Sequence, residues 1–270
     1  MRLAHKTSAH FSRRHPLLTA AACTVVTAPA TILGGMWIYG LKGFSTKEER
    51  QRPLPGDDLL RPSDPRVRLQ EDIEIDAPRE VVWEVLAQLG QDKGGFYALS
   101  WLERLFTFHI HNTFDRVDAW QTVEPGDFLF YHQSGIGSQI VEVGPGRYVT
   151  SISDTRNPPT AEGGMALKPP FGISDFTWTW VFYLEDLPDG RTRFVNRCDS
   201  TWQPWGKLVP KALTYVVLGS PSVFMVRKML QKVKQVAEGR QKPQLIDRAV
   251  RAIGVWDPQA RRKPLGIGHS

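Results

Sequence analysis

The residues best suited to chemistry are large aromatic and polar side chains gathered between positions 97 and 120. An aromatic lining with a few polar groups is typical of a small-molecule pocket, and a positioned His111, Tyr97 or Glu103 could transfer a proton within it. Alternatively, the aromatic residues belong to the core and the charged ones form solvated ion pairs. The cluster consists of Tyr97, Trp101, Glu103, His111, Asn112, Arg116 and Trp120.

Three further ligand-binding candidates lie on later predicted strands. Trp178 and Trp180 alternate with threonines, so both indoles point to one face of a sheet. They either line a cavity or fill the core. Arg197, on the next strand, could bind a ligand carboxylate or enolate, and a surface pair with Asp199 explains it equally well.

The common enzymatic signatures are absent from the chain. It has no G-x-S-x-G, H-E-x-x-H, C-x-x-C, Walker or G-x-G-x-x-G motif. His109 and His111 would share one face of a strand, with Asp115 following, but a hydrogen-bonded histidine at a pocket rim is the simpler interpretation. We therefore expect no metal and no cofactor, and the sequence favours a binding protein over an enzyme.

A strand followed by an amphipathic helix must position these residues. Ile73 and Ile75 alternate with acidic residues, which is typical of a half-buried strand. Asp76 and Pro78 suit the start of a helix, and Gly90 suits its end. The apolar face between them comprises Val81, Val82, Val85, Leu86 and Leu89.

The rest of the chain alternates short strands with turns before a last long helix. Ser220 and Pro221 suit the start of that helix, which has an apolar face running to Ala237. A second helix is predicted at 97–108, a loop at 157–173 and a covering helix or lid at 208–218. Strands are predicted at 128–131, 139–143, 148–152, 176–184 and 193–199.

The stretch 73–90 resembles the start of the helix-grip, START-like (SRPBCC, polyketide cyclase/dehydrase-like) superfamily, in particular a bacterial, membrane-anchored branch. The resemblance covers about residues 67–238. It implies an α+β fold in which an antiparallel sheet wraps around a long C-terminal helix and leaves a cavity for an apolar ligand. It also implies a pocket or lid role for His111 and Asn112. The motifs that carry it are I-x-A-P-x-E-x-V-W at 75–83, Gly95-Phe96-Tyr97, Trp101-Leu102-Glu103, Ile110-His111-Asn112, Trp120-Gln121 and Gly126-Asp127.

A membrane anchor is predicted near the N-terminus. Residues 16–41 carry no charge, and about 20 apolar residues are enough to cross a bilayer as a helix. A cleaved secretory peptide is the alternative, because Ala28-Pro29-Ala30 resembles a cleavage site and Arg13-Arg14 a twin-arginine signal. Basic residues flank the run on both sides in equal number, so the sequence predicts a single-pass cell-membrane protein without a side for its domain.

The charge distribution argues against a nucleic-acid partner. Of a formal net charge of +6, residues 1–14 carry +4 and residues 239–270 carry +5, which leaves −3 for the residues between them. The predicted organisation is a basic tail (1–15), the anchor (16–41), a proline-rich linker or arm (42–66), the START-like domain (67–238) and a basic flexible tail (239–270).

Three functions remain open from the sequence. The first is binding of a lipid or other hydrophobic small molecule in the cavity, for carriage, sensing or sequestration by a membrane-anchored monomer. The second is a cyclase- or dehydratase-like enzyme that acts on a hydrophobic substrate. The third is an anchored protein-interaction module whose core is filled by its own aromatic residues.

Overall fold

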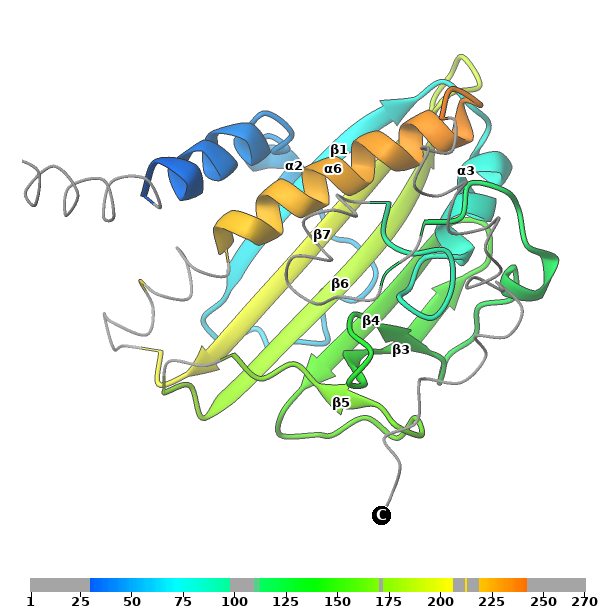
Figure 1. Ribbon diagram of the computed structural model, residues 1–270. Coiled ribbons are helices and arrows are strands. Elements are labelled where there is room, and N and C mark those ends of the chain that lie inside the picture. Colours follow the sequence, from blue (N-terminus) through cyan, green and yellow to red (C-terminus); the bar gives the residue numbers. More distant parts are fainter. Residues whose placement is uncertain are drawn as a thin grey trace, which may run out of the picture.

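The protein is built on one mostly antiparallel sheet, shown in Figure 1. The computed structural model describes residues 30–97, 110, 112–169, 172–205, 212 and 219–241. The strand order is β1-β7-β6-β4-β3-β2, and β5 pairs in parallel with β3. The strands are β1 (Val67–Ile75), β2 (Phe128–Phe130), β3 (Ile136–Gly144), β4 (Tyr148–Asp154), β5 (Met165–Ala166), β6 (Asp175–Asp186) and β7 (Thr192–Gln203).

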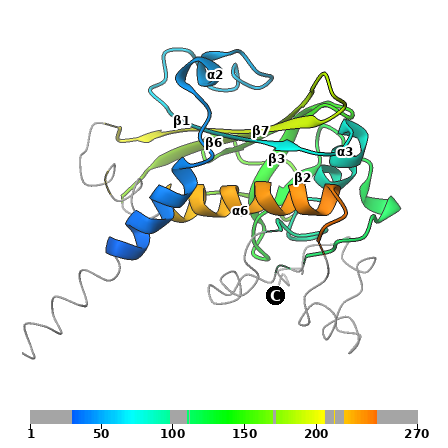
Figure 2. The same cartoon turned by 90° about the horizontal axis from the view of Figure 1, so that it is seen from above.

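One face of the sheet, here called the inner face, meets the long helix α6 (Ser220–Ala237). In Figure 2, α6 lies on one side of the sheet and the short helix α2 (Lys47–Gln51) on the other. Met229, Leu230 and Val233 of α6 are buried in the same core cluster as Phe194 and Leu184 of the sheet. A long C-terminal helix held against an antiparallel sheet agrees with the predicted helix-grip architecture.

The strand periodicity predicted for β6 is confirmed by its pairing with β7. Trp180 lies opposite Cys198, and Leu184 lies opposite Phe194, with all four in the core. The threonines between the tryptophans point to the other face, here called the outer face. Because side chains alternate along a strand, this register also determines the face of the sheet to which each remaining side chain of β7 points.

Helix α3 (Arg79–Ala87) begins later than the sequence suggested. Pro78 occupies the N-cap position, and no side chain caps the helix. Asp76 is therefore not the cap, and its backbone N–H instead donates to Glu238 just beyond α6. Val82, Val85 and Leu86 are buried, as their spacing predicts. The start of α6 at Ser220, with Pro221 in its first turn, is confirmed.

Residues 45–66, here called the arm, pack on the outer face of the sheet. The arm opens with α2, whose Thr46 and Glu49 form a reciprocal capping box. Leu54 and Leu60 of the arm are buried. Gly56 turns the chain with φ of 83°, and a Cβ there would lie 2.3 Å from Cγ2 of Thr150 on the outer face. Only glycine allows the arm to approach β4 so closely.

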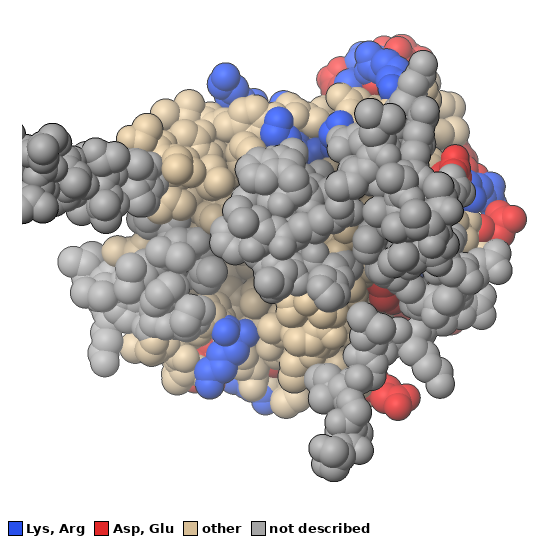
Figure 3. All heavy atoms as spheres, in the orientation of Figure 1, with Lys and Arg blue, Asp and Glu red and all other residues tan. Residues whose placement is uncertain are grey.

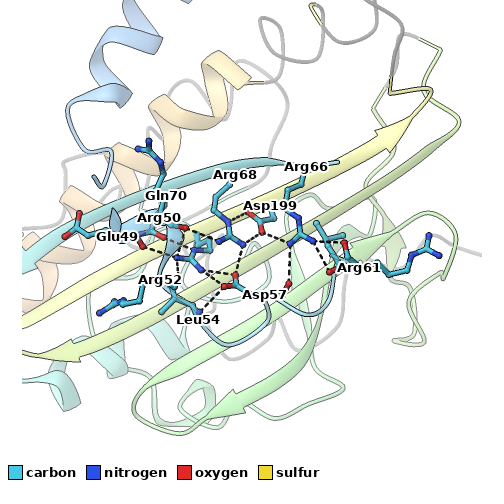
Figure 4. Close-up of polar contacts among 12 residues, drawn as sticks. Glu49, Arg50, Arg52, Leu54, Asp57, Arg61, Arg66, Arg68, Gln70 and Asp199 are labelled. Atoms are coloured by element: carbon cyan, nitrogen blue, oxygen red, sulfur yellow. Dashed lines mark hydrogen bonds and ion pairs between the residues drawn. The ribbon is translucent and has the colours of Figure 1, made fainter. Parts of the chain in front are cut away.

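Arg197 holds the arm in place (Figure 4). Its side chain is 1% exposed. Nη1 donates to both carboxylate oxygens of Asp57 at 2.8 Å, and Nε donates to Gln70 at 2.7 Å. Nη2 donates to the carbonyl oxygen of Arg52 at 2.9 Å. This placement corrects the prediction that Arg197 reaches the ligand, because the guanidinium lies on the face opposite α6.

The alternative pairing of Arg197 with Asp199 is not formed either. Asp199 instead accepts from Arg68, at 2.8 and 2.6 Å, and more weakly from Arg66 at 3.5 Å. Arg68 also donates to Asp57 at 2.8 Å, so the two acids and three arginines form one network. The hydrogen bonds from Arg68 to Asp199 raise the pKa of Arg68, whereas burial lowers the pKa of Arg197.

The chain before the arm is helical over residues 30–41, and its end lies on α6. The Tyr39 hydroxyl donates to Gln231 at 2.5 Å, and its ring centroid is 5.2 Å from that of Phe224. Lys228 Nζ lies 4.4 Å from the same Tyr39 centroid. Gly40 is in close contact with Val223.

Several predicted segments lie wholly or partly outside the described residues. These are the N-terminal part of the proposed anchor (16–29), the second helix (97–108), the covering segment (208–218) and almost all of the basic tail. In the part of the chain that the structure describes, no helix has both the length and the apolar character needed to cross a membrane.

Replacing Asp57 tests the arm's attachment. Asp57→Asn should lower the free energy of unfolding by about 3 kcal/mol, because it leaves the buried Arg197 guanidinium without a carboxylate. The neighbouring Asp58 is exposed, so Asp58→Asn should change stability by less than about 0.5 kcal/mol. Urea unfolding of the full-length variants measures both. Equal effects would contradict the role assigned to Asp57.

Candidate functional site

A hollow lies between α6 and the inner face of the sheet. Its empty space is about 230 Å³, counted out to the surrounding solvent. Most of its lining is apolar and comes from the first half of α6 and from three neighbouring strands. The lining residues are Leu69, Glu71, Trp178, Asn196, Cys198, Ser222, Val223 and Val226.

Glu71 is the one ionisable carboxyl group in this lining. The residue is 2% exposed, and its Oε2 has no hydrogen-bond partner among the described residues. Burial raises the pKa of Glu71 to about 8; the positive charge of Arg227 opposes this shift and the negative charge of Asp72 adds to it. At neutral pH the carboxyl is therefore largely protonated.

The sequence contains a signal for Glu71. Residues 67, 69, 73 and 75 are apolar and share the inner face of β1, and Glu71 occupies the same face between them. Its cross-strand partner is Asn196. An acid at an inward position of an otherwise apolar face is uncommon, because burial of a charge is costly without a partner.

The two tryptophans of β6 have different surroundings. Trp178 is half-buried and lines the hollow. Trp180 is in the core, where its Nε1 donates to Asn196 Oδ1 at 2.5 Å. Its ring centroid lies 4.9 Å from that of Phe182, 5.5 Å from that of Tyr131 and 5.8 Å from that of Phe96. Both interpretations offered by the sequence therefore hold, one for each indole.

Tyr97 is part of a buried hydrogen-bond network outside the hollow. Its hydroxyl donates to the carbonyl of Thr113 at 2.8 Å and accepts from Gln88 Nε2 at 3.0 Å. Its backbone N–H donates to Asn112 Oδ1 at 2.8 Å, and its φ is 54°. Burial raises the pKa of Tyr97 to about 12. The donor and one acceptor lone pair of the hydroxyl are engaged within the loop, and the residue does not line the hollow.

This hydrogen-bond network joins motifs that are distant in the sequence. Gln121 Nε2 lies 3.3 Å from Gln88 Oε1, which also accepts from the backbone of Val117. The loop after α3 is thereby joined to residues 112–121, where the 3₁₀ turn Asp118–Trp120 buries Trp120. These motif residues support local structure, and none of them lines the hollow.

The remaining candidates are exposed or lie outside the described residues. Arg116 is exposed and pairs with Glu84 at 2.5 Å and Asp118 at 3.1 Å, which agrees with the ion-pair interpretation. Trp101, Glu103 and His111 are outside the described part of the chain, so their predicted roles stay predictions. Within the described ranges, no group of three or more His, Cys, Asp or Glu residues could hold a metal ion.

Comparison with known proteins gives similarity in structure only. No family model and no curated protein matches the chain. The Zhui aromatase/cyclase from Streptomyces sp. R1128 has 16% identity and a TM-score of 0.30, over 65% of this chain and 96% of that one. Ara h 8.0201 has 9% identity and a TM-score of 0.34, over 65% and 99%. CalU16 from Micromonospora echinospora has 14% identity and a TM-score of 0.29, over 71% and 88%.

The identities and TM-scores of these three structures are too low to support any inference about fold family or function. The fold assignment rests on the strand order and on the position of α6 against the inner face.

Removing the Tyr97 hydroxyl tests the loop network. Tyr97→Phe should cost about 1–2 kcal/mol of unfolding free energy, because the Thr113 carbonyl and the Gln88 amide both lose a buried partner. Tyr183→Phe is the control, since Tyr183 lies on the outer face against Tyr148. Chemical denaturation of both variants decides the matter, and a Tyr97→Phe protein as stable as the control would refute the network's role.

The raised pKa of Glu71 predicts a pH dependence of stability. The ordinary value is 4.5 and the folded value about 8, so the folded state binds more protons than the unfolded state between these values. Stability should therefore fall as pH rises from about 4.5 to 8. Glu71→Gln removes this dependence, and its stability relative to the natural protein should increase by about 1 kcal/mol or more from pH 5 to pH 8.

The measurement is urea unfolding of both full-length proteins at pH 5 and pH 8. The charged or titratable neighbours of Glu71 are Arg227 of α6, Asp72 of β1 and Cys198 of β7. Burial raises the pKa of the Cys198 thiol well above its ordinary value, so it stays neutral across this range. Parallel pH profiles for the two proteins would show that Glu71 is ionised throughout.

Proposed function

We propose that the protein binds a lipid or other hydrophobic small molecule in the hollow between α6 and the sheet. The observation that carries this proposal is the composition of the hollow: an apolar lining that surrounds one buried carboxyl group with an unpaired oxygen. Apolar walls with a few polar groups are typical of small-molecule sites.

The size of the hollow limits the ligand. Without the open solvent around it, its space is about 10 Å³, room for about one water molecule, against roughly 300–1,000 Å³ for pockets that bind drug-sized molecules. Binding of an apolar molecule or of a lipid segment therefore requires α6 to move away from the sheet. Binding gains about 25 cal/mol per Å² of apolar surface buried, and Glu71 with Asn196 orients the polar end.

The N-terminal region supports a lipid as the ligand class. We propose that residues 16–41 hold the protein to the cell membrane, because the segment has no charged residue. Its last turns lie on α6 beside Val223, which also lines the hollow. Figure 3 shows few charged atoms around the described helical residues 30–41. Ile32, Ile38 and Leu41 are exposed there. Such a site suits carriage, sensing or sequestration of a membrane lipid.

An anchored protein-interaction module is the second candidate, favoured by one observation. Phe96, Tyr131, Trp180 and Phe182 pack together and fill the inner face beside the hollow. A core filled in this way leaves less room for a ligand than the resemblance implies. The cyclase-like alternative gains no comparable support, since Tyr97 does not line the hollow and its other candidate residues lie outside the described ranges.

Filling the hollow tests ligand binding. The full-length protein, purified from its native host, should carry an apolar ligand detectable by native mass spectrometry with lipid extraction. Val226→Trp should lose at least nine-tenths of this ligand, because the indole occupies the hollow. Met225→Trp introduces the same indole at a neighbouring position that does not line the hollow, and it should retain the ligand. An empty natural protein that takes up no added apolar probe would favour the interaction module.

A further inference from the structure

We infer that residues 39–44, here called the latch, hold the first half of α6 against the sheet and keep the hollow closed until they are released. This inference rests on the proposed function, in which a ligand enters only when α6 moves away from the sheet. It goes further by naming the segment that controls this movement.

The N-terminal end of the latch is attached to α6. The Tyr39 hydroxyl donates to Gln231 at 2.5 Å, and its ring centroid lies 5.2 Å from that of Phe224. Lys228 Nζ lies 4.4 Å from the Tyr39 centroid and 5.8 Å from the Phe224 centroid, so one cation interacts with both rings. Because positions 224, 228 and 231 are spaced i, i+4 and i+7, Tyr39 contacts one stripe along the helix.

The C-terminal end of the latch pairs with β1. The carbonyl of Gly43 accepts from Asp72 N–H at 3.1 Å, and Phe44 forms an antiparallel bridge with Glu71. The chain then continues into the arm, which is itself fixed to the sheet. Only residues 40–42 separate the two attachments, so α6 can move away from β1 only after one of them breaks.

Two glycines bring the latch against the walls of the hollow. A Cβ at position 40 would lie 2.8 Å from Cβ of Val223, and a Cβ at position 43 would lie 2.8 Å from Oε2 of Glu71. Val223 and Glu71 both line the hollow, one from α6 and the other from β1. The latch therefore crosses between α6 and β1 at the level of the hollow.

The two halves of α6 are held by different contacts. In the second half, Met229, Leu230, Val233 and Ala237 are buried in the main core cluster. In the first half, Val223 is buried but is not a member of this cluster of described residues, and it lines the hollow instead. Figure 2 shows the helical residues 30–41, the end of the proposed membrane segment, beside this first half. We therefore expect α6 to open at its first half and to pivot about its second half.

The thiol of Cys198 can report this opening. It lines the hollow and is buried, so the neutral reagent iodoacetamide reaches it only after α6 has moved away or the domain has unfolded. The full-length protein is alkylated at pH 7, and peptide mass spectrometry distinguishes Cys198 from Cys23, the other cysteine of the chain.

Releasing the latch should expose this thiol. Tyr39→Ala should increase the rate of Cys198 labelling at least tenfold, because it removes the hydrogen bond and both ring contacts to α6. Gln231→Leu removes the same hydrogen bond from the side of α6 and should increase the rate about threefold. Labelling of both variants at the natural rate would overturn the inference.

Two control variants separate release of the latch from general destabilisation. Ile38→Ala shortens the side chain next to Tyr39, which is 65% exposed, and should label as the natural protein does. Tyr97→Phe weakens the loop network, none of whose residues belongs to the latch, and should also label at the natural rate because α6 opens without global unfolding. If Tyr39→Ala and Tyr97→Phe accelerate labelling in proportion to their loss of unfolding free energy, Cys198 is exposed only by global unfolding and the latch is overturned.

Uptake of deuterated palmitate separates this inference from the proposed function. Native mass spectrometry of the full-length proteins should show uptake at least fivefold faster in Tyr39→Ala, with at least fivefold lower Kd, because the latch no longer favours the closed state. A variant that labels faster at Cys198 but takes up no palmitate would support the latch and contradict the proposed lipid binding. Palmitate binding with unchanged labelling and uptake would support the proposed function and overturn the latch.

Discussion

The structure depends on the neutralisation of one buried guanidinium. Arg197 points from the middle of β7 into a space that only the arm closes, and its charge is met by Asp57, Gln70 and backbone carbonyls of the arm. Buried charges are tolerated only when they are paired and hydrogen-bonded, so the arm has one strongly preferred path across the outer face. That path also leads the chain around the edge of β1, where Gly43 crosses above Glu71.

The two faces of the sheet differ in how their buried ionisable groups are paired. On the outer face, Arg197, Arg68 and Asp199 find several partners each. On the inner face, Glu71 keeps an oxygen without one. Since buried polar groups in folded proteins are normally hydrogen-bonded, the unpaired oxygen of Glu71 supports the proposed binding of another molecule on the inner face. The aromatic packing around Trp180 limits how large that molecule is.

Hydrophobic periodicity predicted the helices and strands well. The candidate site depends on strand register and on side-chain hydrogen bonds, which periodicity does not show. The alternation in β6 and the apolar face of α6 are repeated over many residues, so both could be predicted from the sequence. The face of Arg197 depends on the register of the β6–β7 hairpin, in which Asp186 pairs with Thr192, and a shift of one residue would reverse it. Tyr97 was assigned to a pocket because its residue type suits one, but its partners Gln88 and Thr113 come from separate loops. Glu71 does not stand out in the sequence because a glutamate on a strand is ordinarily exposed, and its burial depends on the packing of α6 and Gly43 over β1.

Because the arm attaches to β7, it can pack on the sheet only after the ribosome has made β7. Asp57 and Arg197 are 140 residues apart, and β1 likewise pairs with β7 in the sheet. At about 5–20 residues per second, the ribosome needs roughly 7–28 s to add the later partner after the earlier one. During this interval Leu54, Leu60 and the paired edge of β1 have nothing to pack against. The arm and β1 are therefore made early but can reach their native packing only after β7 has been made.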